Sequence, residues 1–194
     1  MFSPAADRNK APIYDALQPR LSRVSRLLEI ACGSLQHACF MAPKLTHLTW
    51  LPTDIDPAAI EFGQSLHARP ANVAAPERLD VHDTPWPVTN VDAIYAANLL
   101  HISPSSVLGA LFLGAGQVLN ADGHVYIYGP FKRAGEHTSP GNAAFDQDLR
   151  ARNADWGIRD LAEVAQAAAQ AGFVQTDEIS MPANNLLLEF RRSR

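Results

Sequence analysis

Cysteine is scarce in this chain, which has only Cys32 and Cys39 among 194 residues. Two thiols cannot form a disulfide framework, and these two do not form a C-x-x-C pair. Such cysteine usage is typical of a reducing compartment. Residues 1–10 are polar and have no apolar segment of the kind found in secretory signals. We therefore expect a cytoplasmic protein.

The chain also lacks an excess of positive charge and a long hydrophobic run. Its 16 Lys and Arg residues face 20 Asp and Glu residues, which gives a net charge of −4 and argues against binding to nucleic acid. The most apolar helix candidate, Val107 to Leu119, is shorter than the ~20 residues that span a bilayer. With 47% hydrophobic residues, we expect one globular domain over 1–194, a monomer or homodimer, with a small-molecule partner and no membrane.

Metal-binding and phosphate-binding motifs are absent as well. The seven histidines do not form H-E-x-x-H or another metal-ligand spacing, so we predict no metal. There is no G-x-S-x-G nucleophile motif and no P-loop.

Strand-like and helix-like segments alternate along the chain. This alternation predicts a mostly parallel sheet covered on both faces. Two final strands, separated by Pro182 to Asn185, predict a C-terminal antiparallel hairpin. The long polar connection 129–153 breaks the alternation, and we expect it to be a lid or disordered, with a helix at 143–152. The strands expected are 27–31, 48–53, 78–81, 91–97, 124–128, 173–181 and 186–191; the helices expected are 36–42, 57–66, 103–119 and 160–171, with a turn at 120–123.

This pattern is that of a Rossmann-like α/β fold with a seven-stranded sheet. Dinucleotide-binding domains usually lack the final hairpin, whereas class I S-adenosylmethionine (SAM) dependent methyltransferases usually have it. In open α/β sheets, ligands bind beyond the carboxyl ends of the strands, where the strand order reverses. Site residues are therefore expected at the strand ends.

The first strand ends in Glu29-Ile30-Ala31-Cys32-Gly33-Ser34-Leu35-Gln36-His37. SAM methyltransferases commonly have here an acidic residue and then three glycines at alternate positions. Glu29 and Gly33 match, but Ala31 and Leu35 replace two glycines, and we expect the Leu35 side chain to crowd the methionine part of SAM. We predict that Glu29, Ala31, Gly33 and Gln36 contact SAM; the alternative is an ordinary strand–helix turn.

The next strand ends supply carboxylates. Asp54, followed by Ile55, is placed to accept the ribose hydroxyls, while Asp56-Pro57 is typical of a helix N-cap. Asp80 and Val81 are candidates for adenine. The alternative is that these aspartates are turn, cap or loop residues.

The fourth strand ends at Asn98 and His101, which we expect near the transferred methyl group. His101 is the candidate general base because histidine titrates near neutral pH; the alternative is a packed core residue.

Four further stretches carry a resemblance to a known family. The chain resembles the methyltransferase-like protein 26 family, small SAM-methyltransferase-like proteins of poorly known function. The resemblance implies the class I fold, SAM binding with S-adenosylhomocysteine (SAH) as product, and transferase activity. The family pattern at the first loop is E-I-G-S-G-T-G-Q-H, from which Ala31 and Leu35 depart. The matching stretches are residues 3–13, residues 128–146 (in part), residues 156–160 and residues 181–185.

These stretches also contain the candidate substrate-binding residues. Basic and polar side chains before the first strand and after the fifth strand would suit an anionic acceptor, or the SAM carboxylate in the case of the N-terminal group. The alternative is a solvated basic loop. The candidates are Arg8, Asn9, Lys10, Tyr128, Lys132, Arg133 and His137.

Three hypotheses follow. The first is a SAM-dependent methyltransferase acting on a small, polar or anionic molecule. The second is a degenerate member that binds SAM, SAH or another nucleoside without methyl transfer, or catalyses a different reaction; Leu35 favours it. The third, an NAD-dependent oxidoreductase, is opposed by the missing glycines and by the hairpin.

Overall fold

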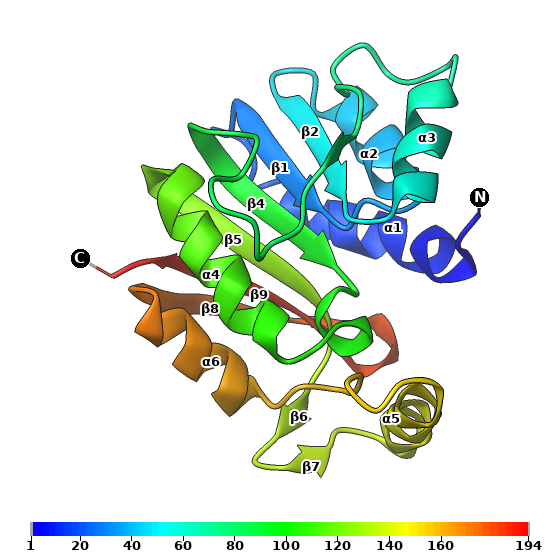
Figure 1. Ribbon diagram of the computed structural model, residues 1–194, viewed down its shortest axis with the longest axis vertical. Helices are drawn as coiled ribbons and strands as arrows, with labels where there is room; N and C mark the ends of the chain where they lie inside the picture. Colours follow the sequence, from blue (N-terminus) through cyan, green and yellow to red (C-terminus); the bar gives the residue numbers. More distant parts are fainter. Residues whose placement is uncertain (1, 194) are drawn as a thin grey trace.

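The computed structural model describes residues 2–193, which form a seven-stranded sheet in the order β3-β2-β1-β4-β5-β9-β8 (Figure 1). Six strands run in the same direction, and β9 alone runs antiparallel, between β5 and β8. This topology confirms the predicted α/β fold with its C-terminal hairpin. The strands are β1 (Arg26–Ile30), β2 (Thr49–Asp54), β3 (Glu77–Arg78), β4 (Val91–Ala97), β5 (Leu119–Pro130), β8 (Phe173–Met181) and β9 (Asn185–Arg192).

The strand order reverses between β1 and β4, in the middle of the sheet. Both strands are buried along nearly their whole length, because helices cover both faces of the sheet. The reversal leaves a crevice at the carboxyl ends of the strands, which is where ligands bind in open α/β sheets. The fold therefore places its binding crevice at the loops that follow β1 and β4.

Helices form two layers (Figure 1). α4 and α6 cover one face of the sheet, and α1, α2 and α3 cover the other. Each layer has its own hydrophobic core, for example with Phe112 of α4 on one side and Ile13 and Leu17 of α1 on the other. The helices are α1 (Pro4–Leu17), α2 (Gln36–Met41), α3 (Pro57–Ser65), α4 (Ser106–Val118), α5 (Pro140–Arg152) and α6 (Leu161–Gln170), with short 3-10 turns at Ala42–Lys44, Leu100–Ile102 and Pro182–Asn184.

Polar residues fix the starts of these helices. The Ser3 hydroxyl accepts the Ala6 N–H at the start of α1, and Asp56 caps α3 ahead of Pro57 as expected. Asp160 and Glu163 form a capping box at α6. Helix α1 itself was not predicted as a helix, and it crosses the carboxyl ends of the strands (Figure 1).

Two segments differ from the sequence prediction. The expected turn at 120–123 belongs to the extended β5, whose pairing with β4 shifts register between Val91 and Ala93. The connection after β5 is ordered: it forms the hairpin β6 (Lys132–Arg133) and β7 (Glu136–His137) and then α5. No helix within residues 2–193 is both long enough and apolar enough to cross a membrane.

Candidate functional site

The loop after β1 has a left-handed backbone at three alternate residues. Ala31, Gly33 and Leu35 have φ angles of 59°, 53° and 58°. Glycine adopts this conformation freely, whereas an L side chain costs ~1–2 kcal/mol there. The loop therefore keeps the backbone that three alternate glycines would form, although two of them are replaced.

The Leu35 side chain points away from this loop into the protein core. It is fully buried, and its Cδ1 lies 2.8 Å from the position that a Cβ on Gly63 of α3 would occupy. The expectation that Leu35 crowds the methionine part of SAM is therefore wrong. The reason is the left-handed conformation of Leu35 at the start of α2, which turns its side chain beneath the helix.

Hydrogen bonds join the ends of β1, β2 and β3 into one rim. The Gly33 N–H donates to Asp54 Oδ2 at 2.8 Å, and the Leu79 N–H donates to the Asp54 carbonyl at 2.9 Å. Gly33, Asp54 and Asp80 therefore lie side by side, as the sequence predicted. Asp54 Oδ1 also accepts the Asp56 N–H at 2.9 Å, so each carboxylate oxygen accepts one protein donor and keeps capacity for another.

The remaining rim residues differ in exposure. Asp80 accepts the His82 N–H at 3.0 Å, and this bond is the main cause that lowers the pKa of its carboxyl group. Ile55 is 54% exposed, and Val81 is buried. The rim thus offers the Asp80 carboxylate and the exposed Ile55 side chain, whereas Val81 packs into the core.

Glu29 does not reach the rim. Its carboxyl is buried, and Oε2 accepts the Trp50 Nε1–H at 2.7 Å. Burial raises the pKa of Glu29 to about 8, more than the Trp50 bond lowers it. Glu29 is therefore neutral at pH 7, and its predicted contact with SAM is not supported by its placement.

Gln36 binds helix α1. Its Oε1 accepts the Ser3 N–H at 2.5 Å, and its Nε2 donates to the Ser3 carbonyl at 3.2 Å. His37, the next residue, contacts Asn9 of α1 at 2.8 Å. The first turn of α2 therefore fixes α1 across the crevice, a role that the sequence did not indicate for Gln36.

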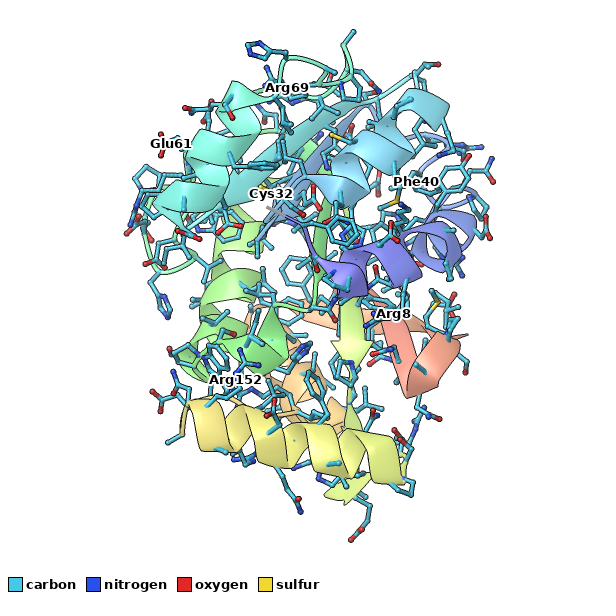
Figure 2. The ribbon with its side chains drawn as sticks, turned by 90° about the vertical axis from the view of Figure 1, so that its right-hand side faces the viewer. Arg8, Cys32, Phe40, Glu61, Arg69 and Arg152 are labelled. Carbon is cyan, nitrogen blue, oxygen red and sulfur yellow. The ribbon has the colours of Figure 1, made fainter. Side chains whose placement is uncertain are left out.

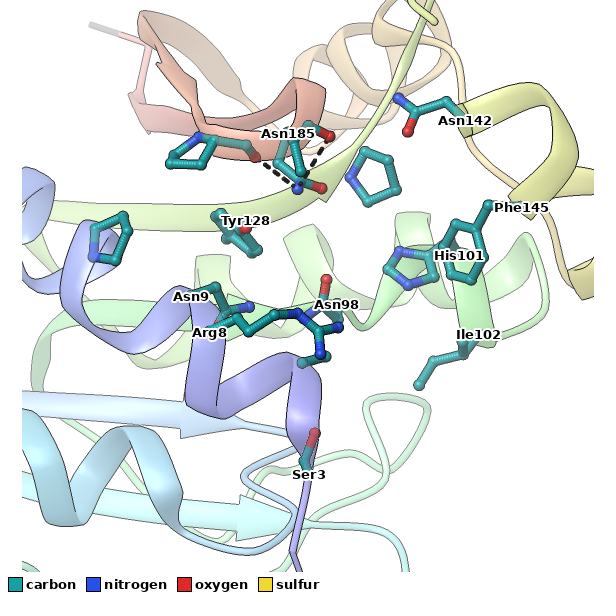
Figure 3. A pocket seen from close by; sticks show the side chains of 15 residues that line it. Ser3, Arg8, Asn9, Asn98, His101, Ile102, Tyr128, Asn142, Phe145 and Asn185 are labelled. Carbon is teal, nitrogen blue, oxygen red and sulfur yellow. Dashed lines mark hydrogen bonds between the residues drawn. The ribbon is translucent and has the colours of Figure 1, made fainter. Parts of the chain in front are cut away.

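A cavity of about 580 Å³ lies between α1, the ends of β4 and β5, and α5 (Figure 3). In the side view of Figure 2, Arg8 lies on the side of α1 that faces this space, above the yellow helix α5. The lining residues are Ser3, Ala5, Arg8, Asn9, Pro12, Asn98, His101, Ile102, Tyr128, Pro130, Asn142, Phe145, Pro182, Ala183 and Asn185.

Five of the predicted site residues line this cavity. They come from α1, from the ends of β4 and β5 and from the turn after β4, which are far apart in the sequence. Figure 3 shows the Arg8 side chain extending toward Asn98. The five are Arg8, Asn9, Asn98, His101 and Tyr128.

The other predicted cations do not line it. Lys10 pairs with Asp7 at 2.5 Å, and Arg133 pairs with Glu178. Lys132 and His137 both contact Asp146 of α5, at 3.1 and 3.4 Å. Their predicted contacts with an acceptor are therefore not supported, because acids elsewhere in the chain pair with them.

His101 is buried against Phe145, with ring centroids 5.4 Å apart in an edge-on arrangement. Burial, and secondly the charge of Arg159, lower the pKa of His101 to about 4. The ring is therefore neutral at pH 7 and faces the cavity. Such a histidine can accept a proton from a bound molecule.

Sequence reasoning missed the far wall of the cavity, where α5 and the 182–185 turn meet. Asn142 Nδ2 donates to Thr138 Oγ1 at 2.9 Å and to the Asn184 carbonyl at 3.2 Å. Ala183 has a left-handed backbone, with φ 58°, a strain of the kind found at binding sites. The sequence did contain a pattern that could have indicated this wall, because both segments belong to the stretches that carry the family resemblance.

Within residues 2–193, no three His, Cys, Asp or Glu side chains cluster so that they could hold a metal ion.

Residues 1–192 match a protein-family model whose description is "Protein of unknown function (DUF938)". The match covers almost the whole chain.

Solved structures of methyltransferases are similar to this fold. Human N-acetylserotonin methyltransferase in complex with SAM has a TM-score of 0.82 at 13% identity, over 96% of this chain and 52% of that one. PigF with SAH has a TM-score of 0.79 at 15% identity, over 97% of this chain and 63% of that one. The mitomycin 7-O-methyltransferase MmcR has a TM-score of 0.79 at 13% identity, over 96% of this chain and 54% of that one. The chain thus spans between half and two thirds of their length, and the likeness shows the class I SAM methyltransferase fold.

Proposed function

The chain belongs to the DUF938 family, and we propose that it is a SAM-dependent methyltransferase acting on a small molecule bound between α1 and α5. One observation carries this proposal: the left-handed residues 31, 33 and 35 lie on the same rim as Asp54, at the crevice of this fold. The methyltransferases with SAM or SAH bound among the similar structures support it.

The rim residues fit SAM. A Cβ placed on Gly33 would meet no atom within 4 Å, so the space over the loop is open for the methionine part. Asp54 has free acceptor capacity for the ribose hydroxyls, and Asp80 with Val81 would contact adenine. Asn98 follows the adjacent strand and lines the cavity, so it would lie between the two bound molecules.

SAM supplies a methyl group on a positively charged sulfur, which keeps the bonding electrons as the methyl carbon bonds to the acceptor. The protein's part is then to align the acceptor with that methyl group. His101, neutral and facing the cavity, would take the proton that an acceptor hydroxyl or amine releases.

The binding-only alternative loses its main support. Leu35 favoured it, and the Leu35 side chain lies in the core. A nicotinamide cofactor remains opposed by the single glycine of the loop. The resemblance to the methyltransferase-like protein 26 family stays a prediction; its stretches at 128–133 and 181–185 contribute residues to the cavity.

Calorimetry with SAM and SAH tests the proposal. We expect micromolar binding of both, and a loss of about 1–3 kcal/mol, or roughly 5–150-fold in affinity, for Asp54→Ala. Asp56→Ala is the matched control, because Asp56 only caps α3. Unchanged affinity in Asp54→Ala, or binding of NAD in place of SAM, contradicts the proposal.

A further inference from the structure

The charge in the cavity is unevenly distributed. Of its 15 lining residues, Arg8 carries the only positive charge at pH 7, and none is acidic. Within residues 2–193, no carboxylate pairs with Arg8, whereas the nearby Lys10 and Lys132 pair with Asp7 and Asp146. An unpaired guanidinium facing a cavity without acids attracts an anion.

A second cation lies behind the wall of the cavity. Arg159 donates to the carbonyls of Leu100 and Ser103, at 3.1 and 2.5 Å, which fixes it beside His101. Its charge is one cause of the lowered pKa of His101. Arg159 thus lies behind the His101 side of the wall, within electrostatic range of Glu163, Asp146 and Asp155, so Arg8 is the cation that faces the cavity.

The rest of the lining is largely apolar. Ile102 and Phe145 are 44% and 38% exposed, and they belong to the few large hydrophobic side chains that remain exposed in residues 2–193. Pro12, Pro130 and Pro182 add further apolar surface. Exposed apolar side chains that line a cavity are typical of a site that covers the apolar part of a ligand.

We infer that the methyl acceptor is an amphipathic monocarboxylate, with its carboxylate on Arg8 and its apolar body against Ile102 and Phe145. The inference rests on the proposed function and adds the substrate class to it. One guanidinium matches one carboxylate, with which it forms two parallel hydrogen bonds. A phosphate dianion would leave a charge unpaired, because the cations Lys132 and Arg133 after β5 are already paired with acids.

The orientation of the acceptor follows from this placement. Arg8 on α1 and Phe145 on α5 lie on opposite sides of the cavity, and Asn98 and His101 lie at the ends of strands between them (Figure 3). An acceptor with its carboxylate on Arg8 therefore directs its apolar body past the site of methyl transfer. A hydroxyl or amine on that body would meet His101.

Titration of the SAH-saturated protein, labelled with 15N and followed by NMR, tests the substrate class. The probes are benzoate, 4-hydroxybenzoate and 4-hydroxycinnamate, each compared with its neutral amide. We expect at least one carboxylate to bind about tenfold more tightly than its amide. In Arg8→Gln, the affinities of the carboxylate and its amide should differ by no more than about twofold, because the substitution removes only the charged contact. Lys10→Gln, on the same helix but paired with Asp7, should keep the full difference.

Three results would overturn the inference. The first is that every amide binds as well as its carboxylate, or that no probe binds. The second is that the preference survives in Arg8→Gln. The third is that Arg8→Gln weakens SAH but not 5′-methylthioadenosine, which lacks the amino-acid carboxylate; Arg8 would then hold SAM. If neither SAM nor SAH binds, the proposed function is refuted, but the inference on the acceptor is not. The same titration without SAH then still measures how far Arg8 makes the cavity prefer a carboxylate to its amide.

Discussion

His37 and Asn9 meet at 2.8 Å between Nε2 and Oδ1, and this contact joins the first turn of α2 to helix α1, which lines one side of the cavity. Because the Asn9 oxygen can only accept, the neutral His37 ring must carry its proton on Nε2. Burial lowers the pKa of His37 to about 4, so the neutral form persists at pH 7. One side of the cavity therefore depends on the contacts between α1 and α2.

Asn9→Ala should loosen helix α1. The substitution leaves the buried Nε2–H of His37 without its acceptor, which costs about 1–3 kcal/mol. Hydrogen exchange should show faster exchange of amides in residues 4–17 and weaker binding of carboxylate probes. Asp15→Ala is the control, since Asp15 is exposed on the same helix and its side chain makes no hydrogen bond or ion pair within residues 2–193. Equal protection of α1 in the wild type and Asn9→Ala would show that the contact does not hold the helix.

Ala31→Gly and Leu35→Gly should have opposite effects on stability. Both residues are left-handed, so glycine relieves ~1–2 kcal/mol of strain at each. Leu35→Gly also removes a fully buried side chain at a cost of ~2–5 kcal/mol, so we expect a net loss of about 2 kcal/mol. Urea unfolding measures both. SAM affinity should not rise in Leu35→Gly; a rise would mean that Leu35 does crowd the bound molecule.

The sequence was informative wherever a local pattern decides the structure. The spacing of Gly33, Asp54 and Asp80 predicted one rim because parallel strands align their carboxyl ends. The 182–185 segment predicted the hairpin because it is short enough to connect two antiparallel strands. These features depend on neighbours in the chain, and they are correct in the structure.

Features set by distant contacts were not predictable in the same way. The direction of the Leu35 side chain depends on the backbone at the start of α2, and glycine patterns alone do not report it. Lys132 and His137 looked like free cations because Asp146, their partner, comes later on a helix that folds back. The pairing of charges separates Arg8 from the other cations that were predicted to bind the acceptor, Lys10, Lys132 and Arg133, and the folded chain shows it.

Glu29→Gln should remove a pH dependence of stability. Burial raises the folded-state pKa of Glu29 from its ordinary value of 4.5 to about 8, so its contribution to stability is fully present below pH 4.5 and is lost as the pH rises through 8. The glutamine amide oxygen can still accept the Trp50 Nε1–H. Relative to the wild type, the unfolding free energy of Glu29→Gln should therefore increase by more than ~1 kcal/mol between pH 5 and pH 8. A constant difference across that range would mean that Glu29 is ionised in the folded protein.

His101 should stay neutral down to about pH 5. Burial and Arg159 depress its pKa to about 4, so its contribution to stability is present above pH 6.5 and is lost as the pH falls through 4. Long-range 1H–15N spectra of the histidine rings measure this directly, and His101→Gln identifies its signals. A midpoint near 6.5 would show that water solvates the ring.

The role of His101 in turnover can be measured once a methyl acceptor is known. The turnover rate should be constant above pH 5, and it should fall about 10²–10⁴-fold in His101→Gln, because glutamine cannot take the proton that the methyl acceptor releases. Full turnover in that variant would leave alignment by Arg8 and Asn98 as the protein's contribution to the reaction.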